Sequence, residues 1–487
     1  MSDRVKRAGI ISAAEFVRFG MKSVIGIILA RILVPADLGS YRQLFLIYST
    51  FSTLMLLGIP NSLLYFIPKL QNDADRRLYI SRTVNLVSIL AFAFGATILI
   101  SRSFIATSFN NPALKDLLLI YAVYPVFMFV TQIYSFVMLG MNKGIKAAQF
   151  TLFSVACDAV LILSAAFLTR NLSAIVIALI ASAFLQWAFA QYQLIAHQSR
   201  FYFSKAYFKE QFHYSLPLGL SALIGMLSIQ LDKFVISGFF TPEQFAVFSI
   251  GAMELPFISI FSNSVNSVLL PSMSEPGLSC NKAEIFRGAV RKNALIIFPL
   301  AMLFFIYAKP IVTLLYTSQY LGSVPFFQVY LLILPLRVAV FGVLFLALGK
   351  TKYILYNAAV TLCLNLILNI ILVKQIGMMG AALATVIVTW ISVLLYLFWM
   401  KTSLGLRIRD YYTPLPVIRT AASVLGAGLM TWLLIMGMEY SLLSQFIGFF
   451  LFMTAYLILG WVFKAIQPYD IDLVKSLLRD GIARLRK

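Results

Sequence analysis

The chain alternates between long apolar stretches and short segments that hold charged residues, proline and glycine. Most apolar stretches reach about 20 residues, the length that an α-helix needs to cross the hydrocarbon core of a bilayer. The pattern therefore predicts about fourteen transmembrane helices. Their expected ranges are 11–33, 41–66, 83–101, 117–139, 147–168, 173–195, 213–238, 245–271, 293–316, 326–348, 354–373, 379–400, 417–437 and 442–464.

The composition agrees with a chain that folds in lipid. Of its 487 residues, 61% are hydrophobic and 12% are charged, and the mean hydropathy is +0.90. A soluble globular protein is about half apolar and about a quarter charged. The predicted helices and their short loops use nearly the whole chain, which leaves no room for a sizeable soluble domain. We therefore predict an all-α polytopic membrane protein.

Lys and Arg are distributed unevenly between the two sets of alternating loops. The cytoplasmic loops of membrane proteins collect these residues, so the set that includes both termini is predicted to be cytoplasmic. Of the 39 Lys and Arg residues, the opposite loops hold only Arg102, Lys115, Arg170, Lys309 and Lys374. Most of the net charge of +21 is thus explained by topology. It is spread over many short segments, which argues against nucleic-acid binding.

The two halves of the chain resemble each other at a nearly constant offset. Residues 32–41 (ILVPADLGSY) match residues 239–248 (FFTPEQFAVF), and each segment follows the first predicted helix of its half. Farther along, Pro125 corresponds to Pro335. An even number of helices in each half makes the repeats parallel, a design in which the substrate site of a transporter lies between the repeats.

This repeat predicts two parallel six-helix lobes, two further helices and a short tail. The expected segments are an N-lobe at 1–200, a C-lobe at 201–403, the two extra helices at 404–466 and a cytoplasmic tail at 467–487. Apolar residues recur at helical spacing through the tail, with Lys and Arg between them. The tail is therefore expected to form an amphipathic helix on the anionic membrane surface.

Several ionisable residues fall inside the predicted helices, where charge is costly and normally faces a cavity or a partner. Basic residues predominate among them. They predict a positively charged central cavity that receives an anionic group, most simply a phosphate or pyrophosphate. The candidate substrate-binding residues are Arg18, Lys22, Lys233 and Arg337, with Arg42 nearer the end of its helix.

The acidic residues at the same depth leave two roles open. They could bind a coupling proton or sodium ion, or they could only neutralise basic neighbours, as Glu15 and Arg18 would at their i,i+3 spacing. The candidates for either role are Glu15, Asp158, Asp232 and Glu254.

The loops hold no signature of covalent chemistry. They contain no phosphate-binding loop, no Ser/His/Asp arrangement and no cluster of metal-ligating residues. The three cysteines lie far apart in the sequence and suggest neither a disulfide framework nor a metal site. We expect no catalytic residue, no metal and no cofactor, and therefore a protein that is not an enzyme.

The beginning of the chain resembles the polysaccharide-transporter branch of the multidrug/oligosaccharidyl-lipid/polysaccharide (MOP) exporter superfamily. The likeness rests on residues 29–41 (LARILVPADLGSY), 57–63 (LGIPNSL) and 66–69 (FIPK). It implies a V-shaped two-lobe transporter that works by alternating access in the bacterial inner membrane. Its expected substrate is a polyprenyl-pyrophosphate-linked oligosaccharide, the precursor of O-antigen, capsule or exopolysaccharide. Membrane lipids, a coupling ion and other polysaccharide-assembly proteins are the further partners that the resemblance suggests.

Three alternative functions remain. A drug/cation antiporter of the same superfamily would share the fold but should favour acidic residues in its cavity. A lipid II flippase would share the helix count and a cationic cavity, although its N-terminal arginine signature is not apparent here. A membrane glycosyltransferase or polymerase usually has a large outer loop with catalytic residues, and the predicted outer loops are short. The flippase for lipid-linked oligosaccharides is the function that the sequence favours.

Overall fold

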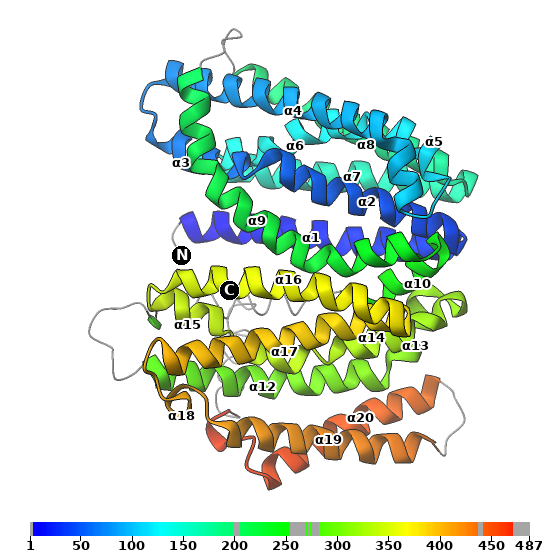
Figure 1. Cartoon of the computed structure of the whole chain (residues 1–487), viewed down its shortest axis with the longest axis vertical. Coiled ribbons are helices and arrows are strands. Elements are labelled where there is room, and N and C mark those ends of the chain that lie inside the picture. Colours follow the sequence, from blue (N-terminus) through cyan, green and yellow to red (C-terminus); the bar gives the residue numbers. More distant parts are fainter. Residues whose placement is uncertain are drawn as a thin grey trace. The chain divides into compact units, whose positions relative to one another are not determined.

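The computed structural model describes residues 3–197, 205–253, 269–270, 272–273, 282–436 and 442–470. Regular structure in these ranges consists of α-helices and short 3-10 helices, without strands, which confirms the predicted all-α class. Long helices that follow one another in the sequence run in opposite directions (Figure 1).

The first half holds α1 to α10, and the second half holds α12 to α20 (Figure 1). Their bounds are α1 (Asp3–Ile32), α2 (Pro35–Leu56), α3 (Ile59–Phe66), η1 (Ile67–Lys69), α4 (Asp73–Ser108), α5 (Leu114–Tyr121), α6 (Tyr124–Gly140), α7 (Gly144–Thr169), α8 (Leu172–Ile195), α9 (Lys205–Phe239), α10 (Pro242–Gly251), α12 (Lys282–Ile306), α13 (Ala308–Tyr316), η2 (Ser318–Ser323), α14 (Val324–Leu331), η3 (Leu334–Val338), α15 (Phe341–Ala347), α16 (Thr351–Ile376), α17 (Met378–Thr402), α18 (Ile408–Tyr411), α19 (Pro414–Met436) and α20 (Leu442–Val462).

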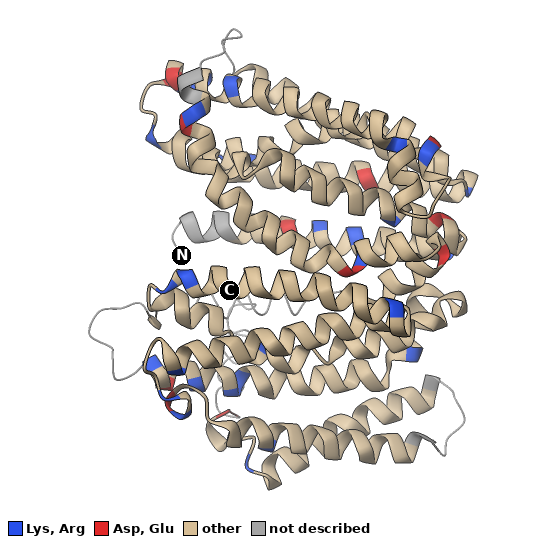
Figure 2. Cartoon of the chain, in the orientation of Figure 1, with Lys and Arg blue, Asp and Glu red and all other residues tan. Residues whose placement is uncertain are grey.

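Among the described residues, 10 helices are long and apolar enough to cross a membrane, or up to 12 if each bent helix pair is one span. Two of the predicted spans are not among these helices. The span at 11–33 lies in α1, which carries three charged residues along its middle. The span at 245–271 begins in α10 and lies mostly outside the described residues. The count of fourteen stays a prediction. Many charged residues lie toward the helix ends, and some lie along the middle of helices (Figure 2).

The bent pairs show where a single predicted span is interrupted. The axis bends by 47° between α2 and α3, where Leu57 and Gly58 both adopt left-handed backbone conformations. Glycine adopts such a conformation without the steric cost that a Cβ brings. The axis bends by 51° between α5 and α6, just before Pro125. Pro335 lies in η3, so both prolines matched by the predicted repeat accompany an irregular helix, although the repeat itself stays a prediction.

The packing of the Cα atoms divides the chain into two compact units. The first unit comprises Met1–Ile250, Leu314–Gly322 and Asn365–Ala381, and the second comprises Gly251–Thr313, Ser323–Leu364 and Ala382–Lys487. Helix α9, which the predicted boundary at 200 assigns to the second lobe, packs in the first unit against α2 and α3. The predicted lobes, extra helices and tail stay predictions, and most of the tail lies outside the described residues.

Two buried amide side chains fasten α9 within the first unit. Near one end, the Gln211 amide donates hydrogen bonds to the hydroxyls of Ser62, at 3.0 Å, and Thr83, at 3.1 Å. Near the other end, the Gln43 amide donates to the Ser237 hydroxyl at 2.6 Å and its oxygen accepts from Asn111 at 2.6 Å. Because these polar atoms are buried, each needs such a partner to avoid a desolvation cost.

Between these two attachments, α9 approaches the bend after α2 so closely that only glycine fits. A Cβ atom added at Gly219 would lie 2.2 Å from the carbonyl carbon of Leu57. A contact that short with a backbone atom cannot be relieved by rotating a side chain, so one of the two helices would have to shift.

We expect Gly219→Ala to destabilise the protein by roughly 1–3 kcal/mol, the usual cost of inserting a methyl group into packed surroundings. Gly225→Ala is the matched control, because it lies on the same helix and a Cβ there meets nothing within 4 Å. The measurement is the thermal unfolding midpoint of the purified protein in detergent. Equal midpoints for the two variants would contradict the close approach of α9 to Leu57.

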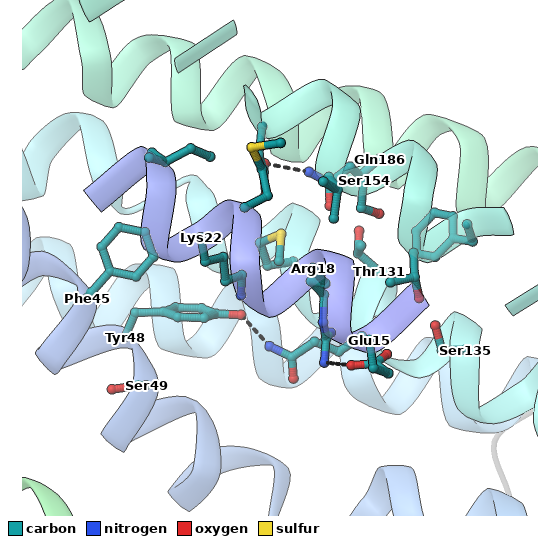
Figure 3. Close-up of a pocket in the computed structure, with 18 of the residues that line it drawn as sticks. Glu15, Arg18, Lys22, Phe45, Tyr48, Ser49, Thr131, Ser135, Ser154 and Gln186 are labelled. Atoms are coloured by element: carbon teal, nitrogen blue, oxygen red, sulfur yellow. Dashed lines mark hydrogen bonds and ion pairs between the residues drawn. The ribbon is translucent and has the colours of Figure 1, made fainter. Parts of the chain in front are cut away.

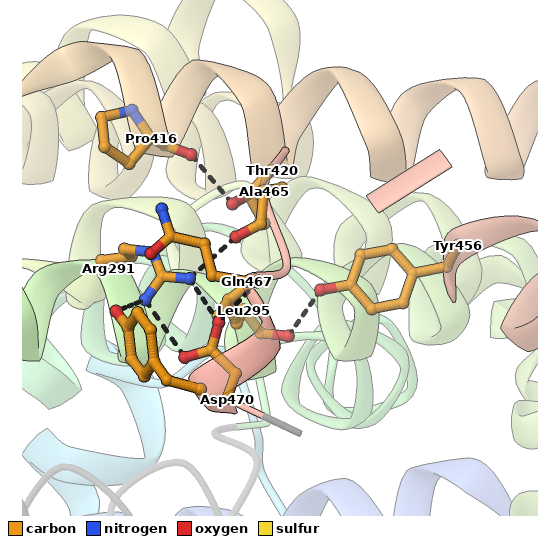
Figure 4. A network of polar contacts seen from close by, with 9 residues as sticks. Arg291, Leu295, Pro416, Thr420, Tyr456, Ala465, Gln467 and Asp470 are labelled. Atoms are coloured by element: carbon orange, nitrogen blue, oxygen red, sulfur yellow. Dashed lines mark hydrogen bonds and ion pairs between the residues drawn. The ribbon is translucent and has the colours of Figure 1, made fainter. Parts of the chain in front are cut away.

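The second unit is held together by aromatic side chains and by one buried ion pair. Its core includes Phe286, Phe341 and Phe345. Arg291 of α12 is only 8% exposed, and it pairs with Asp470 in the segment that follows α20. The guanidinium also donates to the backbone carbonyl of Ala465 at 3.0 Å and to the Tyr469 hydroxyl (Figure 4). This network anchors the chain after α20 to α12.

We expect Arg291→Gln to destabilise the protein by about 3 kcal/mol, because the substitution leaves Asp470 charged, mostly buried and without its cation. Arg287→Gln, one turn earlier on α12, removes the same charge at a position that forms no such buried pair with the described residues, and it should change stability by less than about 1 kcal/mol. Chemical unfolding followed by tryptophan fluorescence compares them. A loss of stability shared equally by both variants would show that only the overall charge matters.

Candidate functional site

The first unit encloses a cavity of about 510 Å³ among α1, α2, α6, α7 and α8. Its walls combine ionisable, hydroxyl, amide and aromatic side chains (Figure 3). Concave sites with a few convergent polar groups are the usual form of a ligand-binding site. The cavity is therefore the candidate functional site of the first unit.

Helix α1 supplies one charged wall of the cavity. Glu15, Arg18 and Lys22 follow one another at spacings of three and four residues, which places them on the same helix face. The Arg18 guanidinium forms an ion pair with the Glu15 carboxylate, and both side chains are about half exposed (Figure 3). Lys22 has no hydrogen-bond or ion-pair partner among the described residues, so its ammonium group is available to a ligand.

Helix α7 supplies an acidic group in another wall of the cavity. The Asp158 carboxylate accepts hydrogen bonds from the Ser182 hydroxyl at 2.7 Å and from the Gln186 amide at 2.8 Å, both on α8. These bonds hold the carboxylate in place while it interacts electrostatically with Lys22. Two basic and two acidic side chains therefore line this cavity, and its formal charge is balanced.

Aromatic and amide groups form the adjoining surface. The Gln132 amide on α6 donates to the Tyr48 hydroxyl on α2 at 2.6 Å (Figure 3). Tyr124 stands edge-on to Tyr48 with ring centroids 4.8 Å apart, and Phe45 lies on the same helix as Tyr48. The hydroxyl of Ser154 is buried and has no hydrogen-bond partner within the described structure. This surface can meet a ligand with both ring faces and hydrogen-bonding groups.

The structure brings Glu15, Arg18, Lys22 and Asp158 into this one cavity, and the other predicted site residues that it describes lie elsewhere. The Lys233 ammonium donates to the backbone carbonyl of Ile229 at 3.3 Å on its own helix. Asp232 is buried, and its carboxylate accepts from the backbone N–H of Lys233 at 2.7 Å. Neither residue lines the cavity, Arg337 lies in η3 of the second unit, and Glu254 lies outside the described residues.

Arg42 belongs to a different polar cluster of the first unit. Its guanidinium donates to the Ser249 hydroxyl at 2.9 Å and shares a hydrogen bond with the Tyr316 side chain. Arg31 donates to the backbone carbonyl of Leu315 at 3.0 Å. Both arginines thus bind the short segment 314–322 to the region where α1 ends and α2 begins.

Sequence reasoning missed the uncharged part of the site. Its signal was nevertheless present, because polar residues repeat at helical spacing along two apolar helices. On α6 the repeat runs through Thr131, Gln132 and Ser135, and on α7 it runs through Thr151, Ser154 and Asp158. Such a stripe on an otherwise apolar helix marks the face that avoids lipid.

Neither a metal site nor a disulfide is found in the part of the chain that the structure describes. No group of three or more His, Cys, Asp or Glu side chains comes together there. Cys157 and Cys363 are free thiols. The side chains that line the cavity offer charge, hydrogen bonding and aromatic surface.

Comparisons with known proteins place the chain in a family. The profile of a family described as polysaccharide biosynthesis protein matches residues 28–325, which is more than half of the chain. A probable low-salt glycan biosynthesis flippase, Agl15 of Haloferax volcanii, is 21% identical over 55% of this chain and 57% of that protein. The capsular polysaccharide biosynthesis protein CapF of Staphylococcus aureus is 26% identical over 40% of this chain and 51% of that protein. The matched segment spans about half the length of these relatives.

Solved structures give the fold over nearly the whole chain. The lipid II flippase MurJ in an inward closed conformation superimposes with a TM-score of 0.75 at 19% identity, covering 93% of this chain and 98% of that one. An inward-facing multidrug resistance MATE transporter of the MOP superfamily superimposes with a TM-score of 0.61 at 14% identity, covering 80% of this chain and 98% of that one. The predicted resemblance is confirmed: the chain is a multi-pass membrane protein with the MOP transporter fold, and it belongs to the family of polysaccharide biosynthesis proteins.

Proposed function

We propose that the protein is a flippase that moves a polyprenyl-pyrophosphate-linked oligosaccharide across the bacterial inner membrane by alternating access. The observation that carries the proposal is the polar cavity with Arg18 and Lys22, within a chain of this family and fold. The relatives named for an activity are a flippase and transporters, which supports a transport function and not an enzymatic one.

The cavity chemistry suits the head of such a substrate. Arg18 can form two parallel hydrogen bonds to a phosphate group, and Lys22 adds a compact positive charge. The hydroxyl and amide groups of the walls can bind sugar hydroxyls, and the rings of Tyr48 and Tyr124 offer apolar faces beside them. The lipid tail would remain in the bilayer.

The two acidic residues of the cavity offer a way to couple substrate binding to a proton or sodium ion. In the structure, Glu15 forms an ion pair with Arg18, and Asp158 interacts electrostatically with Lys22. A proton or sodium ion that neutralises an acid would release its basic partner to the anionic substrate. Substrate and coupling ion would then favour each other's binding.

The remaining predicted site residues keep supporting roles in this proposal. Lys233 and Arg337 would meet the substrate at other stages of transport, and Arg42 would serve near the beginning of α2 through its contacts with Ser249 and Tyr316. Asp232 and Glu254 would be alternative coupling or charge-partner groups. Other polysaccharide-assembly proteins would supply and receive the substrate.

A lipid II flippase is a second candidate, favoured by the fold that the chain shares with MurJ. Both candidate substrates carry a polyprenyl pyrophosphate, so they differ in the sugar and peptide part. The balanced charge of the cavity also keeps a cation antiporter of the MATE type in consideration. A membrane glycosyltransferase has no support among the relatives.

The test is flipping of a polyprenyl-pyrophosphate oligosaccharide by the purified protein in liposomes, with lipid II and a small organic cation as competing substrates. We expect the oligosaccharide to be moved, and we expect Arg18→Ala, Lys22→Gln and Lys233→Ala each to slow flipping by about tenfold or more. The loss of one charged hydrogen bond, roughly 1.5–3 kcal/mol, has this effect.

Lys115→Gln is the matched control, because this exposed lysine of α5 lies outside the cavity and should leave the rate unchanged. Glu15→Gln should preserve flipping, since it frees Arg18. If the protein is inert on the oligosaccharide but exchanges organic cations for protons or sodium, the substrate assignment is wrong. Transport of lipid II alone would instead establish the second candidate.

The proposal places both termini in the cytoplasm, as the distribution of Lys and Arg predicts. We expect alkaline phosphatase fused after Arg170 to be active, because that residue follows α7 on the outer side, and a fusion after Lys143 to be inactive. A green fluorescent protein at the C-terminus should fluoresce. Activity after Lys143 together with inactivity after Arg170 would invert the topology.

A further inference from the structure

A cluster of basic side chains lies where α4 begins, α7 begins and α8 ends. It consists of Arg76 and Arg77 in the first turn of α4, Lys143 and Lys146 at the start of α7, and His197 just after α8. These residues come from separate segments of the first unit. We call this set the basic cluster; it lies outside the cavity described above.

The central contact of the basic cluster joins two bases. The Lys143 ammonium lies 3.1 Å from Nε2 of His197 and donates to it, which requires the imidazole to be neutral. Burial lowers the pKa of His197, and the charges of Lys143, Lys146 and Arg77 lower it further. Burial likewise lowers the pKa of Lys143, with Lys146 and Arg76 adding to the effect. Asp73 opposes both shifts, but its carboxylate is already bound to Arg76 at 2.9 Å.

The backbone and the neighbouring side chains add two further features. Helix α7 begins at Gly144 without a side-chain cap, so its first amides and its dipole favour an anion beside Lys143. Apolar residues next to the basic cluster point outward: Ile145 is 47% exposed, Ile195 66% and Tyr192 75%. A ligand with a phosphate group and apolar chains would cover both features.

We propose that the basic cluster binds a phosphate group, supplied by the headgroup of an anionic phospholipid whose acyl chains lie against the exposed apolar residues. Basic groups at the cytoplasmic ends of transmembrane helices are the usual sites for such headgroups. The anion would offset the repulsion among the four cationic side chains and allow His197 to take up a proton. The proposal does not depend on which substrate the protein moves.

His197 reports the bound anion directly, because the chain has only 2 histidines and the other, His213, lies on α9. The full-length protein, labelled with ¹³C-histidine, would be titrated by NMR in nanodiscs of phosphatidylcholine, with and without phosphatidylglycerol. The His213→Gln variant assigns the two signals. We expect phosphatidylglycerol to raise the pKa of His197 by about one unit more than that of His213, as a nearby opposite charge does.

A second arm adds inorganic phosphate to the phosphatidylcholine nanodiscs at constant ionic strength. A rise in the pKa of His197 with phosphatidylglycerol alone supports a lipid headgroup as the ligand. An equal rise with inorganic phosphate supports the same site with free phosphate as its ligand. The double variant Lys143→Gln/Lys146→Gln should abolish the difference between the pKa shifts of the two histidines. Equal pKa shifts of His197 and His213 in the wild-type protein would overturn the proposal, because they would reflect only the surface potential of the membrane. The absence of any shift would overturn it as well.

Discussion

The structure depends on one constraint: a charge carried into apolar surroundings must find its partner within the chain. Water is absent from the bilayer core, so backbone groups bond within helices and ionisable side chains pair with one another. Arg291 pairs with Asp470, Arg18 pairs with Glu15, and Asp158 accepts two hydrogen bonds while it interacts with Lys22. The helices are positioned so that these pairs can form.

This constraint also shapes what the site can do. A cavity lined by unpaired bases would attract anions strongly but would release them slowly. In the first unit, each base of the cavity has an acid with which it interacts, so an incoming anion competes with Glu15 or Asp158 for the same cation. In the proposed mechanism, binding of the anion would be conditional on the protonation or cation occupancy of those acids, and that condition would be the physical basis of coupled transport.

The sequence was sufficient for features that depend on local spacing. It predicted the helices from apolar length, and it placed Glu15, Arg18 and Lys22 on one helix face. It could not show that Asp158 of α7 would share a cavity with them, because the contact joins helices far apart in the chain. The bend at Leu57 and Gly58 could not be predicted from the sequence either, because a left-handed backbone conformation inside an apolar run leaves its hydropathy unchanged.

The many basic residues of the loops divide into two kinds once their surroundings are known. Most of them are explained by the predicted topology, which requires a number of charges but no particular arrangement. Those of the basic cluster are arranged, because Lys143 donates to His197 while Lys146, Arg76 and Arg77 act on the same pair. An anion bound at the basic cluster, as proposed above, would offset the charges that lower the pKa values of Lys143 and His197.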